Sequence, residues 1–404
     1  MVDFEVLIIG TNMIGYYMAR CFHEAYNVKS FVLGQEKLGF TNDSKILELL
    51  IEPKLDDEDV FLKTLITFYE KHKDNKIILV GSSDDYVKLI VKNEKVLRKY
   101  FLFNYAQMDI IDSLMEKENF YTTYKNSGLE FPKTYIYSFN TEFKLPSDFM
   151  YPIILKPSNV VTYNQNKFAR IDKIYKLQSE SELESAMKAI KDSGYKDSLI
   201  FQEFIPGDDS RLFDSAFYVN SKGQAVCATL AQIGLQEHTK TAIGNCTVLI
   251  NGFSEFGYNN DIVLKLKEFI ESIGFRGFCE FDLKYDERDG KFKVFEINAR
   301  QGRCGYYMTP LGYNLAKCLV DDLIYNKDSD FKILDEEYVL TMVPKTVMKR
   351  HISNKIYKKK LFSLIRSGKW VDPLIYNKDR SIKRRWYLFL RKINYIKKYR
   401  DNEW

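Results

Sequence analysis

Short apolar runs alternate with longer segments of helical periodicity through the first hundred residues of the chain. The short runs have the length of buried strands, and in the longer segments apolar residues recur on one side of a helix. This alternation favours a parallel, doubly wound sheet with helices on both faces. We expect strands at 6–9, 29–33 and 76–80 and helices at 13–25, 60–71 and 84–91.

The pattern changes after a helical stretch at 112–128, where Pro132 marks a new element. Beyond it the chain reads as strands with long connections, which is typical of an α+β arrangement. After about residue 328 it becomes polar and basic, as expected of a C-terminal extension. We expect strands at 153–156, 168–171, 174–177, 199–205, 213–219, 225–233 and 247–250, and helices at 179–193, 260–273 and 314–324.

Two further strand-like segments with period two flank a turn at 288–290. A two-residue turn would pair Asp282 with Ile297, whereas a three-residue loop with a left-handed Gly290 would pair Asp282 with Glu296. We expect the second register, which gathers the polar side chains on one face. That face holds Glu280, Asp282, Lys284, Glu296, Asn298 and Arg300, and the buried face holds Phe281, Leu283, Phe295 and Ile297.

The chosen register sets carboxylates directly opposite each other, with Cβ atoms about 4.5–5.5 Å apart. Like charges so placed destabilise a sheet unless a cation lies between them. Oxygen ligands without His or Cys suit Mg²⁺, which shares its coordination shell with water and substrate phosphates. Arg300 would then stabilise charge on a transferring phosphoryl group. The alternative is a solvent-facing hairpin with scattered charges.

Two other strands end in residues that could bind a nucleotide. The apolar strand 152–157 delivers Lys156, which would either meet phosphate oxygens or extend into solvent. The strand at 201–205 ends in Pro206-Gly207, where backbone amides could bond an adenine edge and a following acid could reach ribose hydroxyls. An ordinary strand and turn is the alternative for this second segment.

The segment Gly10-Thr11-Asn12-Met13-Ile14-Gly15 follows the first strand and opens a helix, as a dinucleotide-binding loop does. It lacks the middle glycine of that motif, and no acidic residue ends the second strand at Leu33. A nicotinamide site is therefore not expected, although the helix N-terminus could take an anionic substrate group. The loop 81–85 is a similar helix start, and capping alone can explain it.

Composition excludes several classes of protein. The chain has 404 residues, 45% hydrophobic and 15% aromatic, which excludes disorder and predicts two or three subdomains. Six single cysteines and four histidines have no zinc-binding spacing, so we expect reduced, buried thiols. No targeting segment and no apolar stretch of about 18 residues is evident. We therefore expect a cytoplasmic enzyme.

Positive charge is concentrated at the C-terminus. Residues 378–404 contain ten Lys or Arg and three Asp or Glu, a net charge of +7, which leaves −2 for the rest of the chain. Trp386, Leu390 and Ile393 recur there at helical spacing. Two alternatives remain: a helix docked on its own domain, and peripheral contact with an anionic membrane. Nucleic acid is not an expected partner, since no recognition fold accompanies the charge.

Several segments together resemble the ATP-grasp superfamily and, within it, the D-aspartate ligases of Gram-positive cell-wall synthesis. The segments are ARCFHEAY at 19–26, FIPGDDS at 204–210, KYDERDG at 284–290, FEINARQGR at 295–303 and KDRSIKR at 378–384. The last is the specific one, because the superfamily in general lacks it. The resemblance implies an α/β and α+β protein with an ATP-grasp fold. Its parts would be a Rossmann-like pre-ATP-grasp domain (1–110), an N-lobe with a lid loop (111–205), a C-lobe with the metal site (206–328) and a basic extension (329–404).

The resemblance also implies roles for individual residues. Lys117 and Lys156 would contact the phosphates of ATP, and Gln202 with the backbone near Glu203 and Ile205 would bind adenine. Asp209 would bind ribose. Asp282, Glu296 and Asn298 would hold Mg²⁺, and the catalytic residues would be Lys156, Arg300 and Arg303.

The implied reaction converts an amino-acid carboxylate into an acyl phosphate and joins it to an amine. By resemblance, the acid is D-aspartate, activated at its side chain, and the acceptor is the lysine side chain of a nucleotide-linked peptidoglycan precursor. Two departures stand out: the lid segment 158–166 contains no glycine, and Glu280 stands where peptide-forming relatives carry arginine. Alternatives are a ligase or carbamoyl-phosphate-synthase-like enzyme with another acid, and a non-catalytic ATP-binding protein.

Overall fold

The computed structural model describes residues 4–159, 162–163, 174–237, 239, 242, 244–258 and 260–402. Its N-terminal part is a parallel four-stranded sheet in the order β3-β2-β1-β4. Alternate residues of β1 face opposite layers: Val6 and Ile8 pack under α1, whereas Leu7 and Ile9 pack with α2 and α3. The elements are β1 Phe4–Ile9, α1 Met13–Tyr26, β2 Ser30–Gly34, β3 Leu47–Ile51, α2 Glu58–His72, β4 Lys76–Gly81 and α3 Asp84–Lys92.

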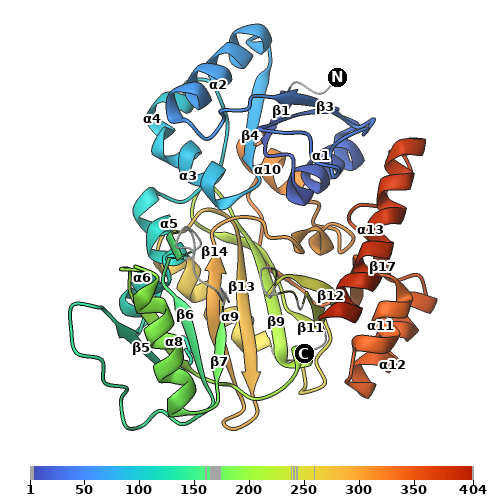
Figure 1. Ribbon diagram of the computed structural model, residues 1–404. Helices are drawn as coiled ribbons and strands as arrows, with labels where there is room; N and C mark the ends of the chain where they lie inside the picture. Colours follow the sequence, from blue (N-terminus) through green and yellow to red (C-terminus); the bar gives the residue numbers. More distant parts are fainter. Residues whose placement is uncertain are drawn as a thin grey trace.

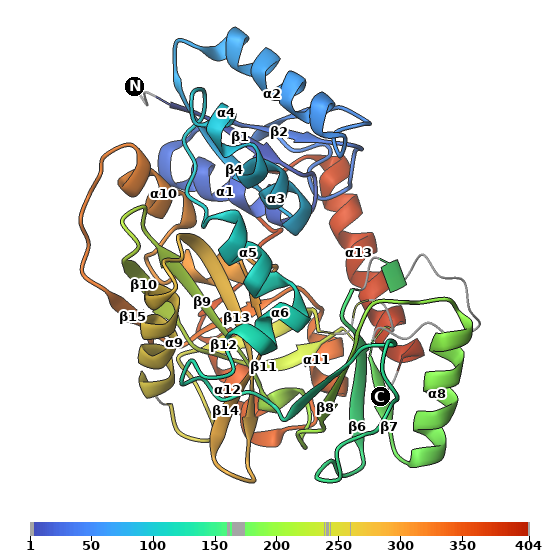
Figure 2. The ribbon, with the colours of Figure 1, turned by 90° about the vertical axis from the view of Figure 1, so that its left-hand side faces the viewer.

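Short helices lead from this sheet into a second, antiparallel sheet with the order β5-β8-β6-β7. The helix α8 covers this sheet through Leu183, Ala186 and Ile190 (Figure 2). The elements are α4 Glu94–Leu97, α5 Met108–Met115, α6 Lys117–Thr123, β5 Thr134–Tyr137, β6 Ile153–Pro157, β7 Tyr175–Leu177, α8 Glu180–Asp192 and β8 Leu199–Glu203.

The third and largest sheet has nine strands and occupies the centre of the molecule (Figure 1). One face packs against α9 through Phe217, Phe281 and Ile297, and the opposite face carries polar side chains. Its central elements are η1 Asp209–Arg211, β9 Leu212–Val219, β10 Ala225–Thr229, β11 Ala231–Gln236, β12 Cys246–Asn251, α9 Asn260–Ser272, β13 Gly277–Asp286, β14 Lys291–Asn298, η2 Gly305–Met308 and α10 Leu315–Leu323.

The segment expected to be a C-terminal extension begins by adding strands to this sheet. The strand β15 pairs with β10, and β16 pairs with β12 and β17. The final helix, α13, lies along one side of the molecule and contacts both the N-terminal part and the large sheet (Figure 1). The elements are β15 Lys332–Leu334, β16 Tyr338–Thr341, α11 Lys345–His351, α12 Lys355–Arg366, β17 Trp370–Val371 and α13 Ile382–Asp401.

The expected elements are confirmed to within a few residues where the structure describes them. The strand expected at 225–233 is instead two strands, β10 and β11, because strand pairing is interrupted between Thr229 and Ala231. Before this point β10 pairs with β9, and after it β11 pairs with β12. The helical stretch at 112–128 is divided between α5 and α6, and β3 was not expected. The strand predicted at 168–171 and much of the predicted lid at 158–166 lie outside the described residues.

Candidate active site

The hairpin of β13 and β14 brings the predicted acidic side chains together. Asp282 pairs with Glu296, and Glu280 pairs with Asn298, which confirms the expected register at these positions. Gly290 has the expected left-handed conformation, with a φ of +70°. The loop itself has the four residues 287–290, so the predicted three-residue loop was wrong.

A β-bulge accounts for the difference. Leu283 pairs with Val294 and Asp282 with Glu296, so Phe295 is an extra residue in β14. Because of the extra residue, Asp282 and Glu280 have the predicted partners. The bulge also turns the side chain of Phe295 to the face opposite the predicted one. Phe295 therefore lines a cavity, and its predicted place on the buried face beside Phe281 was wrong.

The three expected magnesium ligands present oxygen atoms on these neighbouring strands. The Asn298 Nδ2 donates to Asp282 Oδ2 at 3.3 Å, and Lys117 Nζ lies 3.9 Å from Glu296 Oε2. Two carboxylates and an amide carbonyl suit a hard cation such as Mg²⁺. The described part of the chain has no cluster of three His, Cys, Asp or Glu side chains that could hold a metal. A metal at this hairpin would thus need the Asn298 carbonyl and ligands from water or substrate.

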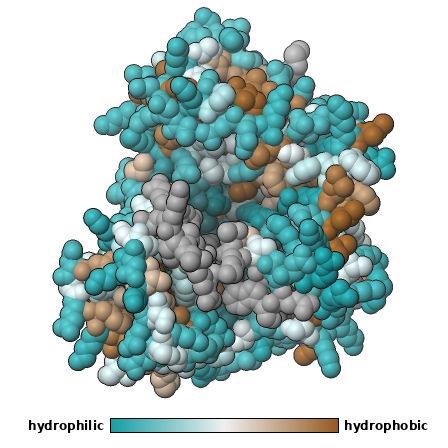
Figure 3. All heavy atoms as spheres, in the orientation of Figure 1, coloured by the Kyte–Doolittle hydropathy of each residue, from teal (hydrophilic) through white to brown (hydrophobic). Residues whose placement is uncertain are grey.

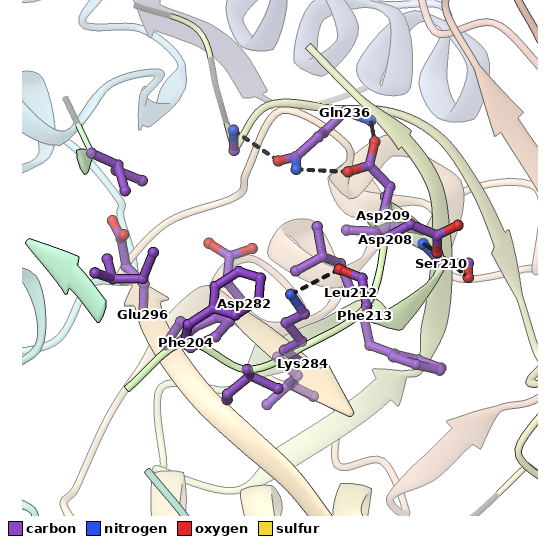
Figure 4. Close-up of a pocket in the computed structure, with 18 of the residues that line it drawn as sticks. Phe204, Asp208, Asp209, Ser210, Leu212, Phe213, Gln236, Asp282, Lys284 and Glu296 are labelled. Carbon is purple, nitrogen blue, oxygen red and sulfur yellow. Dashed lines mark hydrogen bonds between the residues drawn. The ribbon is translucent and has the colours of Figure 1, made fainter. Parts of the chain in front are cut away.

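Asp282 and Glu296 project into a cavity of about 480 Å³ between the four-stranded antiparallel sheet and the nine-stranded sheet (Figure 4). Its walls combine apolar side chains, which suit a flat aromatic ring, with charged groups at the ends. Every residue expected to contact ATP lines this cavity. These residues are Lys117, Lys156, Gln202, Glu203, Ile205 and Asp209.

Lys156 reaches the cavity from the end of β6. Its side chain is buried, and its Nζ lies 3.4 Å from the hydroxyl of Tyr121. The Tyr121 hydroxyl in turn donates to the backbone carbonyl of Phe295 at 2.6 Å. The bulge in the β13–β14 hairpin therefore fixes a tyrosine of α6 beside the lysine.

The opposite end of the cavity holds the expected adenine and ribose contacts. Gln202 is buried and donates to Thr134 Oγ1 at 2.8 Å, while Glu203 accepts from Arg288 at 2.7 Å. Asp209 accepts from both the backbone and the side chain of Gln236, at 3.0 and 2.8 Å. Figure 4 shows Asp209 held by the side chain of Gln236.

Lys284 lies on the floor of the same cavity, although sequence reasoning gave it no role. Its Nζ donates to the Gly207 carbonyl at 3.3 Å. Burial, together with the nearby charge of Lys176, lowers the pKa of Lys284 to about 8, despite the opposing effect of Asp209. A lysine so placed adds positive charge next to the bend expected to bind the nucleoside.

A second, more polar cavity of about 450 Å³ adjoins the first and shares Asp282, Glu296 and Gly244 with it. Arg300 and Arg303, the two expected catalytic arginines, line only this second cavity. The expected magnesium ligands therefore stand where a nucleotide-sized space meets a smaller space with positive groups.

Arg300 is held by the N-terminal domain. Its Nε lies 2.5 Å from Asp84 Oδ1, and one terminal nitrogen lies 3.4 Å from Asn298 Oδ1. Asp84 is the first residue of α3, in the loop that sequence analysis assigned only to capping. The ion pair thus joins that loop to the candidate metal site.

Arg303 is held by two residues that sequence analysis missed. It lies 2.5 Å from Glu237 Oε1 and donates to the Tyr395 hydroxyl at 3.0 Å. Lys398, on the same helix as Tyr395, lies 3.2 Å from the other oxygen of Glu237. Burial alone would raise the pKa of Glu237, but the charges of Arg303 and Lys398 lower it below its ordinary value.

Two buried carboxyl groups form one wall of the second cavity. Asp214 lies across from Asp282 on β9, and Tyr307 donates to it at 2.5 Å. Glu280 accepts from the Gly302 backbone at 2.8 Å, and a side chain at residue 302 would collide with its carboxylate. Burial raises the pKa of Asp214 to about 6, and burial raises that of Glu280 as well. Glu280 is thus a buried acid that a backbone hydrogen bond from Gly302 holds in place.

The N-terminus of α1 also faces the second cavity through Asn12, Met13 and Ile14. Asn12 caps the helix by accepting from Gly15 at 3.0 Å, and its amide donates to the Ser82 carbonyl at 2.8 Å. A Cβ at Gly10 would lie 2.0 Å from Ser82, so this glycine permits close packing of the two loops. The helix N-terminus leaves a positive potential directed at the cavity.

Comparison with known proteins bears on the whole chain. No protein-family model matches it. Among curated proteins, the chain is 32% identical to the D-aspartate ligase of Enterococcus faecium (strain Aus0004) over 415 residues, which cover 98% of this chain and 97% of that protein.

Solved structures of similar fold have much lower identity. The chain is 16% identical to an N5-carboxyaminoimidazole synthetase from Staphylococcus aureus, with a TM-score of 0.61 and coverage of 84% and 82% of the two chains. It is 15% identical to an L-amino acid ligase from Bacillus licheniformis, with a TM-score of 0.57 and coverage of 80% and 75%. The biotin carboxylase domain of a Hydrogenobacter thermophilus 2-oxoglutarate carboxylase, solved with MgADP and bicarbonate, has 12% identity, a TM-score of 0.59 and coverage of 84% and 74%. At such identities the likeness concerns the fold alone.

Proposed function

This chain belongs to the D-aspartate ligase family and has the ATP-grasp fold, and on that premise we propose that it is an ATP-dependent carboxylate–amine ligase. The observation that carries the proposal is the position of Asp282 and Glu296 at the junction of two cavities. One cavity has the size and lining for a nucleotide, and the other has positive groups for a carboxylate.

In this proposal ATP occupies the larger cavity. Gln202 and the backbone near Glu203 and Ile205 contact adenine, and Asp209 contacts ribose. Lys117 and Lys156 contact phosphate oxygens next to the acidic hairpin. Relatives of the same fold solved with ADP or MgADP support the choice of ligand.

Asp282, Glu296 and Asn298 would hold Mg²⁺, whose chemistry here would be to neutralise charge on the ATP phosphates. The repulsion between carboxylates paired across the hairpin supports this assignment, because a bound cation would relieve it. Lys117, 3.9 Å from Glu296, offsets part of the same charge.

The acid substrate would bind in the second cavity, near Arg300, Arg303 and the N-terminus of α1. One of its carboxylate oxygens attacks the γ-phosphorus of ATP, and the bond from that phosphorus to the β,γ-bridging oxygen breaks to release ADP. The acceptor amine then attacks the acyl carbon, the amine loses its proton, and inorganic phosphate leaves as the amide forms. Arg300 and Arg303 would stabilise the negative charge of the phosphoryl and acyl groups in transit.

We propose D-aspartate as the acid, activated at its side-chain carboxylate, on the basis of the named relative. The amine would be the lysine side chain of a nucleotide-linked peptidoglycan precursor, as the sequence resemblance implies. Both ATP and such a precursor are cytoplasmic, and six buried, unpaired cysteines suit a reducing compartment. We accordingly place the reaction in the cytoplasm.

The proposal divides the chain as the resemblance implies. Residues 1–110 would form the pre-ATP-grasp domain, 111–205 the N-lobe, 206–328 the C-lobe and 329–404 the extension. The grouping of the strands into three sheets supports this division, although β15, β16 and β17 of the proposed extension join the sheet of the proposed C-lobe.

The metal and phosphate assignments are tested by Glu296→Gln. Turnover, measured as ADP release with D-aspartate and the precursor, should fall on the order of 10²–10³-fold, and the Mg²⁺ concentration for half-maximal rate should rise. Glu287→Gln is the matched control, because Glu287 lies in the same hairpin with an exposed side chain that pairs with Arg211. Near-normal ligation by Glu296→Gln would refute the metal site.

Substrate identity is tested by offering a panel of amino acids with the nucleotide-linked precursor. D-aspartate should support ADP release and give a product heavier by one aspartyl residue in mass spectrometry. If only a different acid supported activity, that acid would replace D-aspartate as the proposed substrate. Activity with bicarbonate would favour a carbamoyl-phosphate-synthase-like reaction. Binding of ATP without turnover on any acid would mean a non-catalytic ATP-binding protein.

A further inference from the structure

The final helix, α13, has two faces of different character. Its inner face is buried against the rest of the molecule through Arg384, Tyr395 and Tyr399. Its outer face carries a row of large, exposed apolar side chains. They are Ile382 (87% exposed), Trp386 (61%), Phe389 (53%), Leu390 (46%), Ile393 (47%) and Ile396 (41%).

We define these six residues as the outer stripe. At about 100° per residue, they fall within an arc of roughly 120° on the side of the helix opposite Arg384 and Tyr395. Figure 3 shows apolar side chains gathered over the position of α13. Of the fourteen large apolar side chains that are exposed in the described residues, these six lie on one helix. Single exposed apolar residues need no explanation, but a row of six does.

Basic residues border the outer stripe. Exposed Arg385 lies on one side of it and exposed Lys383 on the other, while exposed Lys397 lies within the arc near its Lys383 side. Neither Arg385 nor Lys397 has a carboxylate within 4.0 Å in the part of the chain that the structure describes, and Lys383 has one only at that limit. The helix contains eight Lys or Arg and a single acid, Asp401.

We propose that the outer stripe of α13 docks on the surface of an anionic lipid bilayer, with the helix lying in the plane of the interface. Apolar side chains would enter the boundary between headgroups and acyl chains, and bordering Lys and Arg would contact lipid phosphates. Trp386 suits this boundary, because indole has an apolar body and a polar edge. Within the described residues, no helix is long and apolar enough to cross a membrane.

Charge favours a bilayer over a second copy of the chain. Two outer stripes packed together would bring Arg385, Lys383 and Lys397 of both copies close to one another, with Asp401 as the helix's sole acid. An anionic bilayer instead supplies the opposite charge to every bordering residue.

The inner face of the same helix holds the candidate active site. The Tyr395 hydroxyl accepts from Arg303 at 3.0 Å and donates to Glu237 Oε1 at 3.4 Å, and Tyr399 donates to the Gln236 carbonyl at 2.7 Å. The docking surface and these contacts lie on opposite sides of one helix. The outer stripe itself lines neither cavity, so removing it should spare catalysis.

The test is sedimentation of the full chain with vesicles of phosphatidylcholine, with and without phosphatidylglycerol. The full chain should bind vesicles containing phosphatidylglycerol, and the bound fraction should fall with salt. The variant Trp386→Ser/Phe389→Ser/Ile393→Ser should lose at least tenfold in partition coefficient. The control Met150→Ser/Ile356→Ser removes exposed apolar side chains elsewhere and should bind as the natural sequence does.

A second variant tests the charges. Arg385→Gln/Lys397→Gln should weaken binding to anionic vesicles about thirtyfold, because each basic residue contributes about 1 kcal/mol near such a surface. Unchanged binding of the triple variant, or equal binding to neutral vesicles, would overturn the proposal. So would sedimentation velocity that shows a dimer for the natural chain and a monomer for the triple variant. The triple variant should release ADP in solution at the same rate as the natural chain. A loss of membrane binding is thereby distinguished from a failure of the proposed ligase activity.

Discussion

Arg303 owes its position to partners from two distant segments. Glu237 follows β11, and Tyr395 lies on α13, 92 residues beyond Arg303 in the chain. Neither partner lines the cavities, so both act through the arginine. Docking of α13 therefore contributes one of the two contacts that orient Arg303.

Replacing Tyr395 with Phe removes one of these hydrogen bonds. We expect the kcat for ligation to fall about fivefold, because a single hydrogen bond contributes roughly 1 kcal/mol. The effect should be absent in an Arg303→Gln background, which a double-mutant cycle measures. Tyr387→Phe, on the same helix, should have no effect. A full Tyr395→Phe effect without Arg303 would exclude the positioning role.

Glu237 makes stability depend on pH in a defined direction. Its folded pKa lies below the ordinary value of 4.5 because of Arg303 and Lys398, so its stabilisation is present above that value and is lost as pH falls through the lowered pKa. Glu237→Gln should reduce the free energy of unfolding by about 2 kcal/mol near neutral pH, less than for a fully buried pair because Lys398 is partly exposed. Urea unfolding should show this difference shrinking below pH 4.5. A constant difference across that range would contradict it.

At the residue scale, sequence reasoning found the side chains that carry a local pattern. Asp282, Glu296 and Asn298 stand in adjacent strands, where alternation and turn chemistry restrict their pairing. Asp84 and Glu237 were missed because they approach Arg300 and Arg303 from 216 and 66 residues away. Hydrophobic periodicity along the sequence does not predict contacts between residues so far apart in the chain.

At the scale of elements, the β13–β14 hairpin was predicted with the right pairing and the wrong turn. A left-handed Gly290 is compatible with loops of three or four residues, so the sequence could not choose between them. The bulge at Phe295 compensates for the longer loop. The Phe295 carbonyl accepts from Tyr121 of α6, and Tyr121 thereby links this hairpin to Lys156.

This link predicts a specific defect for Tyr121→Phe. Without its hydroxyl, Lys156 loses one of the groups that orient it, so we expect the KM for ATP to rise about fivefold with a smaller change in kcat. Steady-state ADP release at varied ATP measures both. Tyr124→Phe is the matched control, since its hydroxyl bonds Ser113 at 2.6 Å and no other side chain among the residues that the structure describes. If the KM for ATP rose equally in Tyr124→Phe, the effect of Tyr121→Phe would be explained by lower stability of α6 and not by the position of Lys156.

At the scale of the whole molecule, the segment 378–384 joins the two ends of the chain. Asp379 accepts from the hydroxyls of Tyr16 and Ser44, at 2.9 and 2.8 Å, and from the Lys45 backbone at 2.6 Å. The match of this segment to the D-aspartate ligases was recognised in the sequence, but its role was not. The physical reason is distance, because Asp379 lies 363 residues from Tyr16.

Arg384 completes this junction. Its Nε lies 3.1 Å from Asp379, its guanidinium carbon lies 3.7 Å from the centre of the Tyr16 ring, and it donates to the Phe40 carbonyl at 2.5 Å. The arginine is 1% exposed and Asp379 is 4% exposed. Both charges are therefore stabilised by each other and by the N-terminal domain.

Breaking one half of such a pair leaves the other charge buried and uncompensated, which costs about 3–5 kcal/mol. Arg384→Met should lower the free energy of unfolding by that amount in urea titration, whereas Arg380→Met, at an exposed site three residues after Asn377, should change it little. The double variant Asp379→Asn/Arg384→Met should be less destabilised than the sum of its single variants, because neither charge remains. Additive losses would instead mean that the two residues stabilise the junction independently, and that the N-terminal domain alone neutralises Asp379.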